Sequence, residues 1–213
     1  MTRPEIAKAA RLSDNGALTK YLEELGQCGF VRRYAAFGKR NKDALFQLMD
    51  NFTLLHYTFL SATGQTRIRS WAKNVDSHFH STWEGLAFEH LCLSHLPQMK
   101  AALGISGVEA DGCSWRGTTP DGQGVQIDLL IDRADRVVNL CEMKWSDGPY
   151  ALTNDDIESL SRKREALKAA DERGRSIFIT LVTTAGLVHN SQWNDVQSEI
   201  SLDDLFVDAP KSR

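Results

Sequence analysis

The stretch Val125–Lys144 constrains the fold most, because it combines two apolar runs with charged residues at regular positions. Val125–Asp132 and Val137–Lys144 are both rich in β-branched and aliphatic residues. The Asp-Arg-Ala-Asp segment where they meet has the composition of a turn. The sequence therefore predicts two strands joined as a hairpin.

Three charged side chains of this hairpin are expected on one face. Successive side chains on a strand point to opposite faces, so Asp128 shares a face with Gln126, while Glu142 and Lys144 lie together on the second arm. Pairing of the two arms brings Asp128 close to Glu142 and Lys144. A buried charge without a partner is costly, so such groups are usually paired or hold a metal ion.

Carboxylate oxygens that leave room for water suit a hard cation such as Mg²⁺ or Mn²⁺. An ion held by Asp128 and Glu142 could polarise a phosphoryl oxygen and activate a water molecule, and Lys144 could stabilise the developing charge. An ion pair with a purely structural role is the alternative for the same residues.

Composition sets the class of protein. The chain has 213 residues, of which 42% are hydrophobic and 25% charged, enough for one large or two small domains. No apolar run approaches the roughly 20 residues of a membrane helix, and the first residues lack a signal-peptide pattern, so we expect a cytoplasmic protein. No Walker A loop occurs, so no ATP site is expected in this chain. The cysteines form no CxxC pair, which argues against zinc and for reduced thiols: Cys28, Cys92, Cys113 and Cys141.

The first 50 residues have the plan of a winged helix-turn-helix. Helical patterns cover Glu5–Ala10 and Ala17–Leu25, and two strands, Phe30–Ala35 and Ala44–Leu48, flank a basic turn. In such a module the second helix can enter a major groove while the wing contacts phosphate. Residues 1–50 carry a net charge of +3 against −6 for the remainder. The expected phosphate contacts are Arg32, Arg33, Lys39, Arg40 and Lys42. A docking module with a solvated wing is the alternative.

The domain boundaries follow from composition. A packing helix over Asp50–Ser61 completes a first domain at residues 1–61, residues 62–80 form a polar linker, and residues 81–213 form a second domain. Ser81-Thr82-Trp83-Glu84 reads as a capping box that opens a helix through about Leu96. Glu89 falls inside the apolar arc of that helix and needs a cation, either a metal ion at the site or an arginine.

The second domain continues with alternating strands and helices. Thr153 or Asn154 is expected to cap a helix, on which Lys163 and Arg164 could approach a phosphate while Arg162 pairs with Glu158 on a solvated face. The predicted strands around it are Val108–Arg116, the two hairpin arms, a buried central strand at Ser176–Thr184 and a last strand at Glu199–Ile200.

The order Asp128, then Glu142-Met143-Lys144, resembles the signature of the PD-(D/E)xK nuclease superfamily. This resemblance implies an α/β (α+β) domain with the restriction-endonuclease-like mixed sheet flanked by helices. It implies Asp128, Glu142 and Lys144 as catalytic residues, and the first-helix segment ending in Glu89 adds a fourth. Gln126 departs from the pattern, because many of these nucleases carry a glutamate or another residue there.

The chain as a whole resembles the C-terminal half of a prokaryotic AAA-type ATPase family, in which a P-loop domain precedes a winged helix and a restriction-endonuclease-like domain. The segments that carry this resemblance are Glu5–Ala9, Lys20–Leu25, Gly85–Glu89, Gln126–Asp132 and Leu140–Lys144. The ATPase domain is absent from these 213 residues, so the resemblance implies an ATPase partner, in cis in a longer chain or in trans.

Two functions are therefore expected from different classes. The first is Mg²⁺- or Mn²⁺-dependent hydrolysis of phosphodiester bonds in DNA. The second is a catalytically inactive nuclease-like module that binds DNA or a partner and serves an ATPase. We expect no membrane partner, and a homo-oligomer remains open.

Overall fold

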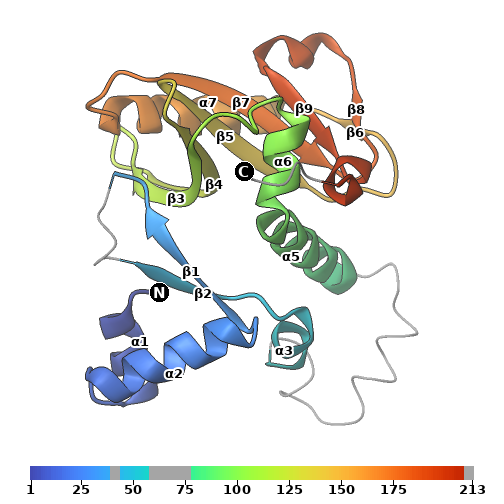
Figure 1. The fold of residues 1–213 in the computed structure, drawn as a ribbon. Coiled ribbons are helices and arrows are strands. Elements are labelled where there is room, and N and C mark those ends of the chain that lie inside the picture. The colour runs from blue at the N-terminus through green and yellow to red at the C-terminus, as the bar shows by residue number, and fades with distance from the viewer. Residues whose placement is uncertain (39–43, 58–77, 209–213) are drawn as a thin grey trace. The chain divides into compact units, whose positions relative to one another are not determined.

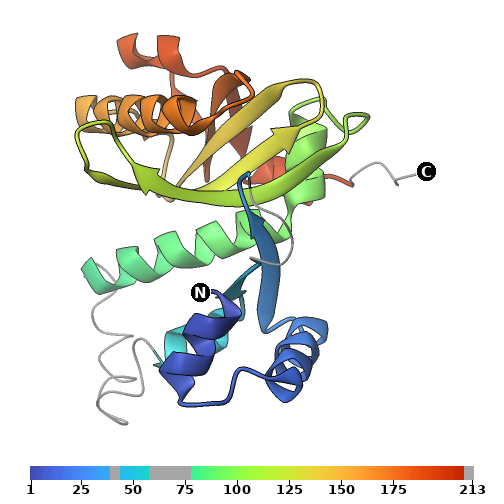
Figure 2. The same cartoon turned by 90° about the vertical axis from the view of Figure 1, so that its left-hand side faces the viewer.

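The computed structural model describes residues 1–38, 44–57 and 78–208. It has a mixed α/β fold, and its internal contacts divide the chain into two units, Met1–His90 and Leu91–Arg213. Each unit is described by itself below, and Figures 1 and 2 show their elements.

The first unit is a pair of helices followed by an antiparallel strand pair. Its elements are α1 (Arg3–Ala10), α2 (Gly16–Gln27), β1 (Val31–Ala36), β2 (Leu45–Leu48) and α3 (Asn51–Leu55) (Figure 1). The strands pair in register from Val31 with Leu48 to Tyr34 with Leu45. A small core of Ala7, Leu18 and Leu22 packs against Ile6 and Phe46, so α1, α2 and β2 bury apolar residues together.

Local sequence signals set where these helices begin. Thr2 and Glu5 form a capping box at the start of α1, and Pro4 lies in the first turn, where a missing N–H is tolerated. Asn15 caps α2 by accepting hydrogen bonds from the Ala17 and Leu18 backbone amides. The predicted order of helix, turn, helix and strand pair is confirmed.

The second unit is built on a five-stranded mixed sheet in the order β3-β4-β5-β7-β9. The neighbours from β3 to β5 are antiparallel, and those from β5 to β9 are parallel. The strands are β3 (Ala110–Thr118), β4 (Gly124–Arg133), β5 (Val137–Lys144), β7 (Ser176–Thr183) and β9 (Ser198–Ser201). A separate parallel pair joins β6 (Tyr150–Ala151) to β8 (Leu187–Val188). The helical elements are α6 (Leu96–Ala102), α7 (Asn154–Ala170), and the 3-10 turns η3 (Ser191–Asp195) and η4 (Asp203–Phe206).

Helices cover this sheet, which explains why its central strands are apolar on both sides. The long helix α7 runs along one face (Figure 2), where it contacts β3, β4 and β7 and buries Leu160 and Leu167. On α6, the Leu96 side chain lies so close to Gly112 of β3 that an added Cβ would approach it to 2.7 Å. Ile127 and Leu130 are both fully buried although they point to opposite faces of β4.

The start of the helix that crosses the boundary between the two units was mispredicted. Helix α5 spans His78–Ser94, so Ser81 lies inside the helix and the capping box expected at Ser81–Glu84 is wrong. His80 in the added first turn is buried, and packing of such a turn outweighs a local capping signal. Helix α3 covers Asn51–Leu55 and continues as π-helix through Tyr57. The rest of the helix expected to Ser61, and most of the expected linker, fall in residues 58–77, which lie outside the described residues.

Candidate functional site

The predicted hairpin is confirmed, and its register fixes the face of the three charged residues. Leu129 pairs with Cys141 and Leu130 with Leu140 across β4 and β5. One step further along the same register, Asp128 falls opposite Glu142, and opposed residues of an antiparallel pair share a face. Asp128, Glu142 and Lys144 therefore lie on one face of two neighbouring strands. This is the face that α7 covers, because α7 side chains reach Glu142 and Lys144.

Helix α7 adds two charged groups, and the result is a chain of alternating charges. Lys163 Nζ lies 2.6 Å from Glu142 Oε2, and Lys144 Nζ lies 3.5 Å from Glu142 Oε1. Lys144 Nζ also lies 3.0 Å from Asp156 Oδ1. The Glu142 side chain is 18% exposed and that of Lys163 17%, so these ion pairs are largely shielded from water. Glu142 is thus held between two ammonium groups.

Asp156 is positioned by the beginning of α7. Thr153 caps the helix, as one of the two predicted alternatives, and its hydroxyl and backbone N–H both donate to Asp156 Oδ2. Tyr150 Oη donates to the same oxygen at 2.9 Å. Burial acts to raise the pKa of Asp156, but hydrogen bonds from Thr153, Lys144 and Tyr150 outweigh it and lower that pKa to about 2. Asp156 is therefore a fixed anion at neutral pH.

The pKa values of Tyr150 and Lys144, which both contact Asp156, are raised. Burial, followed by its hydrogen bond to Asp156, raises the pKa of Tyr150 to about 12. Burial acts to lower the pKa of Lys144, but the hydrogen bond to Asp156 and the charge of Glu142 outweigh it and leave the pKa raised. Lys144 therefore stays protonated at neutral pH, which suits it to stabilise negative charge rather than to act as a general base.

Asp128 and Gln126 lie on the open part of the same face. Gln126 Nε2 donates to Asp128 Oδ1 at 2.5 Å, and Asp128 is half-buried. The amide supplies a neutral hydrogen bond and no counter-charge. Asp128 and Glu142 therefore present two carboxylates on one face of neighbouring strands, an arrangement that suits a cation.

A buried hydroxyl adjoins this cluster from the next strand. In the parallel pair β5 and β7, Lys144 is in register with Thr183. Thr183 is fully buried, and its Oγ1 has no hydrogen-bond partner in the described part of the protein. The sequence analysis identified neither Thr183 nor Asp156 as part of the site. The Thr153-x-x-Asp156 capping box directly after the β5 loop was the available signal for Asp156.

The donor set is compatible with a divalent ion at Asp128 and Glu142. Mg²⁺ usually binds one or two carboxylates and completes its shell with water and substrate phosphate. The cluster holds three carboxylates and two lysines, so it has a net negative charge that a cation would reduce. Among the described residues, no group of three or more His, Cys, Asp or Glu side chains is arranged to hold a metal ion.

The fourth predicted site residue lies in the first unit. Glu89, on α5, is half-buried and accepts a hydrogen bond from Gln47 Nε2 of β2 at 3.4 Å. Its approach to Asp128 and Glu142 stays a prediction, because the structure describes each unit by itself.

The expected nucleic-acid contacts have varied environments. Arg32 donates twice to Gln47 and its guanidinium lies 4.3 Å from the centre of the Tyr34 ring. Arg164 pairs with Asp195 of η3 at 3.6 Å, whereas Lys163 is bound to Glu142. Lys39, Arg40 and Lys42 lie outside the described residues.

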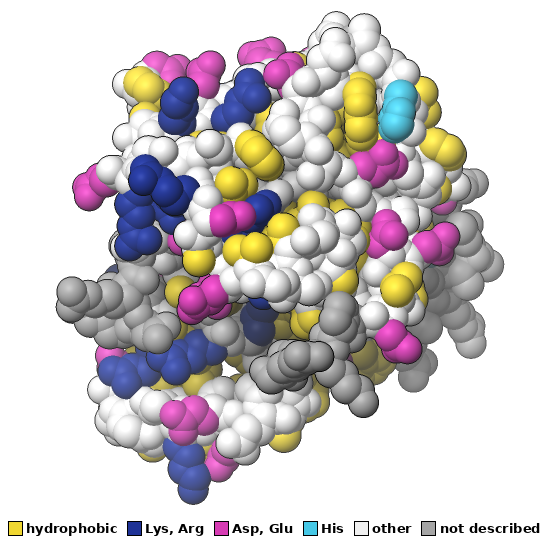
Figure 3. All heavy atoms as spheres, turned by 45° about the horizontal axis from the view of Figure 1, so that its top comes forward, with side chains coloured by type: hydrophobic (Ala, Val, Ile, Leu, Met, Phe, Trp, Pro, Cys, Tyr) yellow, Lys and Arg dark blue, Asp and Glu magenta, His cyan; other side chains and the backbone are white. Residues whose placement is uncertain are grey.

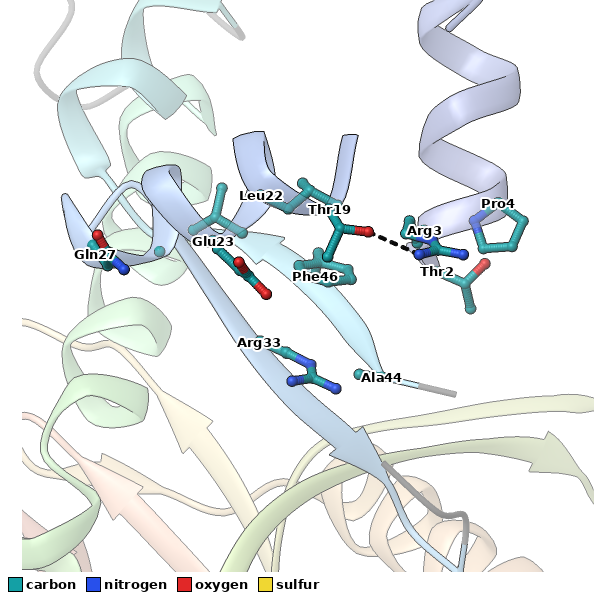
Figure 4. A pocket seen from close by; sticks show the side chains of 12 residues that line it. Thr2, Arg3, Pro4, Thr19, Leu22, Glu23, Gln27, Arg33, Ala44 and Phe46 are labelled. Atoms are coloured by element: carbon teal, nitrogen blue, oxygen red, sulfur yellow. Dashed lines mark hydrogen bonds between the residues drawn. The ribbon is translucent and has the colours of Figure 1, made fainter. Parts of the chain in front are cut away.

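Arg33 lines a cavity of about 990 Å³ between the helices and strands of the first unit. Figure 4 shows Arg33 of β1 and Glu23 of α2 extending into this cavity, and the hydrogen bond from Arg3 to Thr19 at its margin. The cavity is thus lined by two basic residues, Arg3 and Arg33, and one acidic residue, Glu23, a mixed lining that does not by itself define a ligand.

Comparison with models of known protein families, with curated proteins and with solved structures finds no match for this chain. None of the helices in the described ranges has both the length and the apolar character that crossing a bilayer requires.

Proposed function

We propose that the second unit is a restriction-endonuclease-like domain that hydrolyses phosphodiester bonds in DNA with Mg²⁺ or Mn²⁺. The observation that carries this proposal is the face shared by Asp128, Glu142 and Lys144 on two adjacent strands, with Lys144 kept protonated. Two carboxylates for a cation and one ammonium for the transferred phosphoryl group form the minimal set for this reaction.

In this proposal each side chain has a separate task. Asp128 and Glu142 hold the ion, which when bound polarises a phosphoryl oxygen and lowers the pKa of a water molecule. Lys144 donates hydrogen bonds to the negative charge that develops on the phosphate. Asp156 holds the Lys144 ammonium in place at 3.0 Å. Lys163 pairs with Glu142, and with an ion bound at Glu142 its ammonium group would be available to a phosphate oxygen.

We further propose that the first unit is a winged helix-turn-helix that binds DNA and that the whole chain is the nuclease part of an AAA-type ATPase system. Two features support this: the order α1, α2, β1, β2, and the basic residues of and between the two strands, with Arg32, Arg33, Lys39, Arg40 and Lys42 as phosphate contacts. Fold similarity alone does not establish activity, so the nuclease is tested directly.

The test is cleavage of labelled DNA by the purified full chain in the presence of Mn²⁺. Asp128→Asn and Lys144→Ala should each reduce cleavage by at least a hundredfold, because each removes a group that contacts the ion or the reacting phosphate. Glu165→Gln and Lys168→Ala make the same changes at exposed positions of α7 and should cleave as the wild type does. Cleavage that survives the first pair of substitutions would come from a contaminant or another site, and the proposal would then be wrong.

A second candidate is a catalytically inactive module that binds DNA or a partner and serves an ATPase. The observation in its favour is that both Glu142 oxygens already face ammonium groups, from Lys144 and Lys163. Saturable Mn²⁺ binding that is lost in Glu142→Gln supports the nuclease. Absence of Mn²⁺ binding, together with loss of DNA binding in the double variant Lys39→Glu and Arg40→Glu, supports the second candidate.

A further inference from the structure

A second charged feature lies at the other end of the same strands. Four arginines and one alanine line a cavity of about 430 Å³: Arg133, Ala134, Arg136, Arg173 and Arg175. They come from the turn between β4 and β5 and from the connection between α7 and β7. Lys and Arg side chains also gather at the left of the face shown in Figure 3. A cavity lined by this many guanidinium groups is unusual, because like charges repel one another.

Two of these arginines are neutralised from outside the cavity. Arg175 binds Asp171 at 2.7 Å and Asp132 at 2.5 Å, and its side chain is only 6% exposed. Arg133 binds Asp135 and donates to Asn139. None of these three aspartates lines the cavity. The carboxylates therefore hold the side chains of Arg133 and Arg175 in place in the cavity lining, and they do so without placing negative charge inside the cavity.

The other two arginines are not neutralised. Arg136 donates one hydrogen bond to the Arg173 carbonyl oxygen at 3.2 Å, which leaves its remaining N–H groups available. The Arg173 side chain makes no hydrogen bond or ion pair with the described residues, and its residue is exposed. Arg136 has a left-handed backbone conformation, φ 67°, which directs the turn so that its carbonyl accepts from Ser176 of β7. The contact holds the Arg136 guanidinium against the backbone of Arg173, and both side chains line the same cavity.

We propose that this cavity, the arginine pocket, binds a phosphate group. Guanidinium is planar and offers paired N–H donors that match phosphate oxygens, and it remains charged at every physiological pH. Within the described ranges no aromatic side chain lines the pocket, so recognition rests on the charge of the phosphate and not on stacking with a base. The ligand is therefore a compact group with at least two negative charges, from a free phosphate compound or from a nucleic acid end.

The arginine pocket is distinct from the candidate nuclease site. Val137, next to the β4–β5 turn, and Glu142 are five residues apart on β5, which corresponds to about 17 Å at the rise of a strand. A single phosphate cannot contact both. The inference does not use the metal, Asp128 or Lys144, so a failure of the nuclease assay leaves it intact.

The test is calorimetric titration of the metal-free full chain with pyrophosphate at low salt, and separately with short single-stranded DNA with and without a 5′-phosphate. We expect saturable binding of one phosphate ligand per chain. The double variant Arg136→Gln and Arg173→Gln should bind at least about tenfold more weakly, since each substitution removes charge-assisted hydrogen bonds to the phosphate. The control is Arg11→Gln with Arg162→Gln, which removes the same net charge from exposed positions outside the pocket.

Each outcome decides the proposal. If pyrophosphate binds and its binding weakens only in the pocket variant, the proposal is supported and the ligand is a free phosphate compound. If only 5′-phosphorylated DNA binds, and its binding also weakens only in the pocket variant, the proposal is supported and the ligand is a nucleic acid end. Equal weakening in the control would show a general effect of charge and overturn the proposal, as would the absence of saturable binding of any probe. The single variant Arg173→Gln protects the test against misfolding, because its side chain has no contact to lose.

Discussion

Substitution of Asp156 by asparagine tests whether the ion-pair chain across β5 and α7 stabilises the fold. The change keeps an oxygen that can accept from Thr153 but removes the charge facing Lys144. The pKa of Asp156 falls from 3.8 to about 2 on folding. At about 1.4 kcal/mol per pKa unit this corresponds to about 2–3 kcal/mol. Water reaches part of the side chain, which is 11% exposed, so we expect a loss of about 1–2 kcal/mol at pH 7.

The lowered pKa of Asp156 also predicts how the loss of stability in Asp156→Asn changes with pH. A carboxyl group whose pKa is lower in the folded state stabilises it fully above the pKa of the unfolded chain, and the contribution disappears as the pH falls through the folded value. For Asp156 that window extends from about pH 4 down to about pH 2. The difference in unfolding free energy between wild type and Asp156→Asn should therefore be constant from pH 7 to pH 5 and shrink below pH 4.

Urea denaturation followed by circular dichroism at several pH values measures this difference. Asp155→Asn is the matched control, because Asp155 is exposed in the same first turn and interacts mainly with the helix dipole, worth a few tenths of a kcal/mol. If the Asp156 variant is as stable as wild type at pH 7, or if its deficit persists unchanged at pH 3, the ion pair with Lys144 does not stabilise the fold and our reasoning is refuted.

Three further predictions concern other parts of the second unit and the cysteines. Arg175→Met leaves its buried carboxylate partner without a counter-charge, so it should destabilise the protein by about 3–5 kcal/mol in the same assay, whereas Arg162→Met should stay within about 0.5 kcal/mol. Cys28 is exposed and the other three cysteines are buried, so a thiol reagent at pH 8 should modify one thiol rapidly in the folded protein and four in denaturant; a second fast thiol would contradict the structure. Lys163→Met removes one of the two ammonium groups that compete for Glu142, so Mn²⁺ should bind several-fold more tightly by calorimetry; unchanged or weaker binding would argue against Glu142 as a ligand.

The thiol prediction follows from the environment of the buried cysteines. Burial is the main cause that raises the pKa of Cys113 to about 12, and burial likewise raises the pKa of Cys141 far above its ordinary value. Both side chains therefore stay protonated and unreactive at pH 8. The sequence-based expectation of reduced thiols rested on the absence of CxxC pairs, and the thiol assay tests it.

Elements with a strong local signal were predictable from the sequence. The β4–β5 hairpin follows from two aliphatic runs around Asp132–Arg136, and β7 from a continuous apolar run. The shared face then follows from alternation, because a slip of one residue would turn Asp128 to the face opposite Glu142 and Lys144. Local chemistry thus placed the three charged residues on one face.

The partners of those residues could not be predicted, because they come from distant parts of the chain. Lys163 reaches Glu142 across 21 residues, and Arg175 reaches Asp132 across 43. Sequence reasoning assigned Lys163 to a phosphate, since periodicity gives the position of a residue on a helix but not the strand that the helix covers. The face on which Glu142 lies could be predicted because it depends on the alternation of side chains along a strand. Its ion pair with Lys163 could not, because that depends on how α7 crosses the sheet.

The direction of the strands explains why charged groups gather at both ends of the β5–β7 pair. These strands are parallel, so their carboxyl ends meet, and there Lys144 lies in register with Thr183. Their amino ends also meet, and there the turn before β5 and the connection before β7 bring Arg136 and Arg173 together. The carboxyl ends of strands are the usual position of ligand sites in open α/β sheets, which favours the Glu142 end for catalysis. The amino ends of the strands, where Arg136 and Arg173 lie, are not such a usual position. The Arg136 and Arg173 guanidinium groups have no carboxylate partner among the described residues, so they are the groups that the proposed phosphate would contact, and pyrophosphate is the simplest compound that tests this.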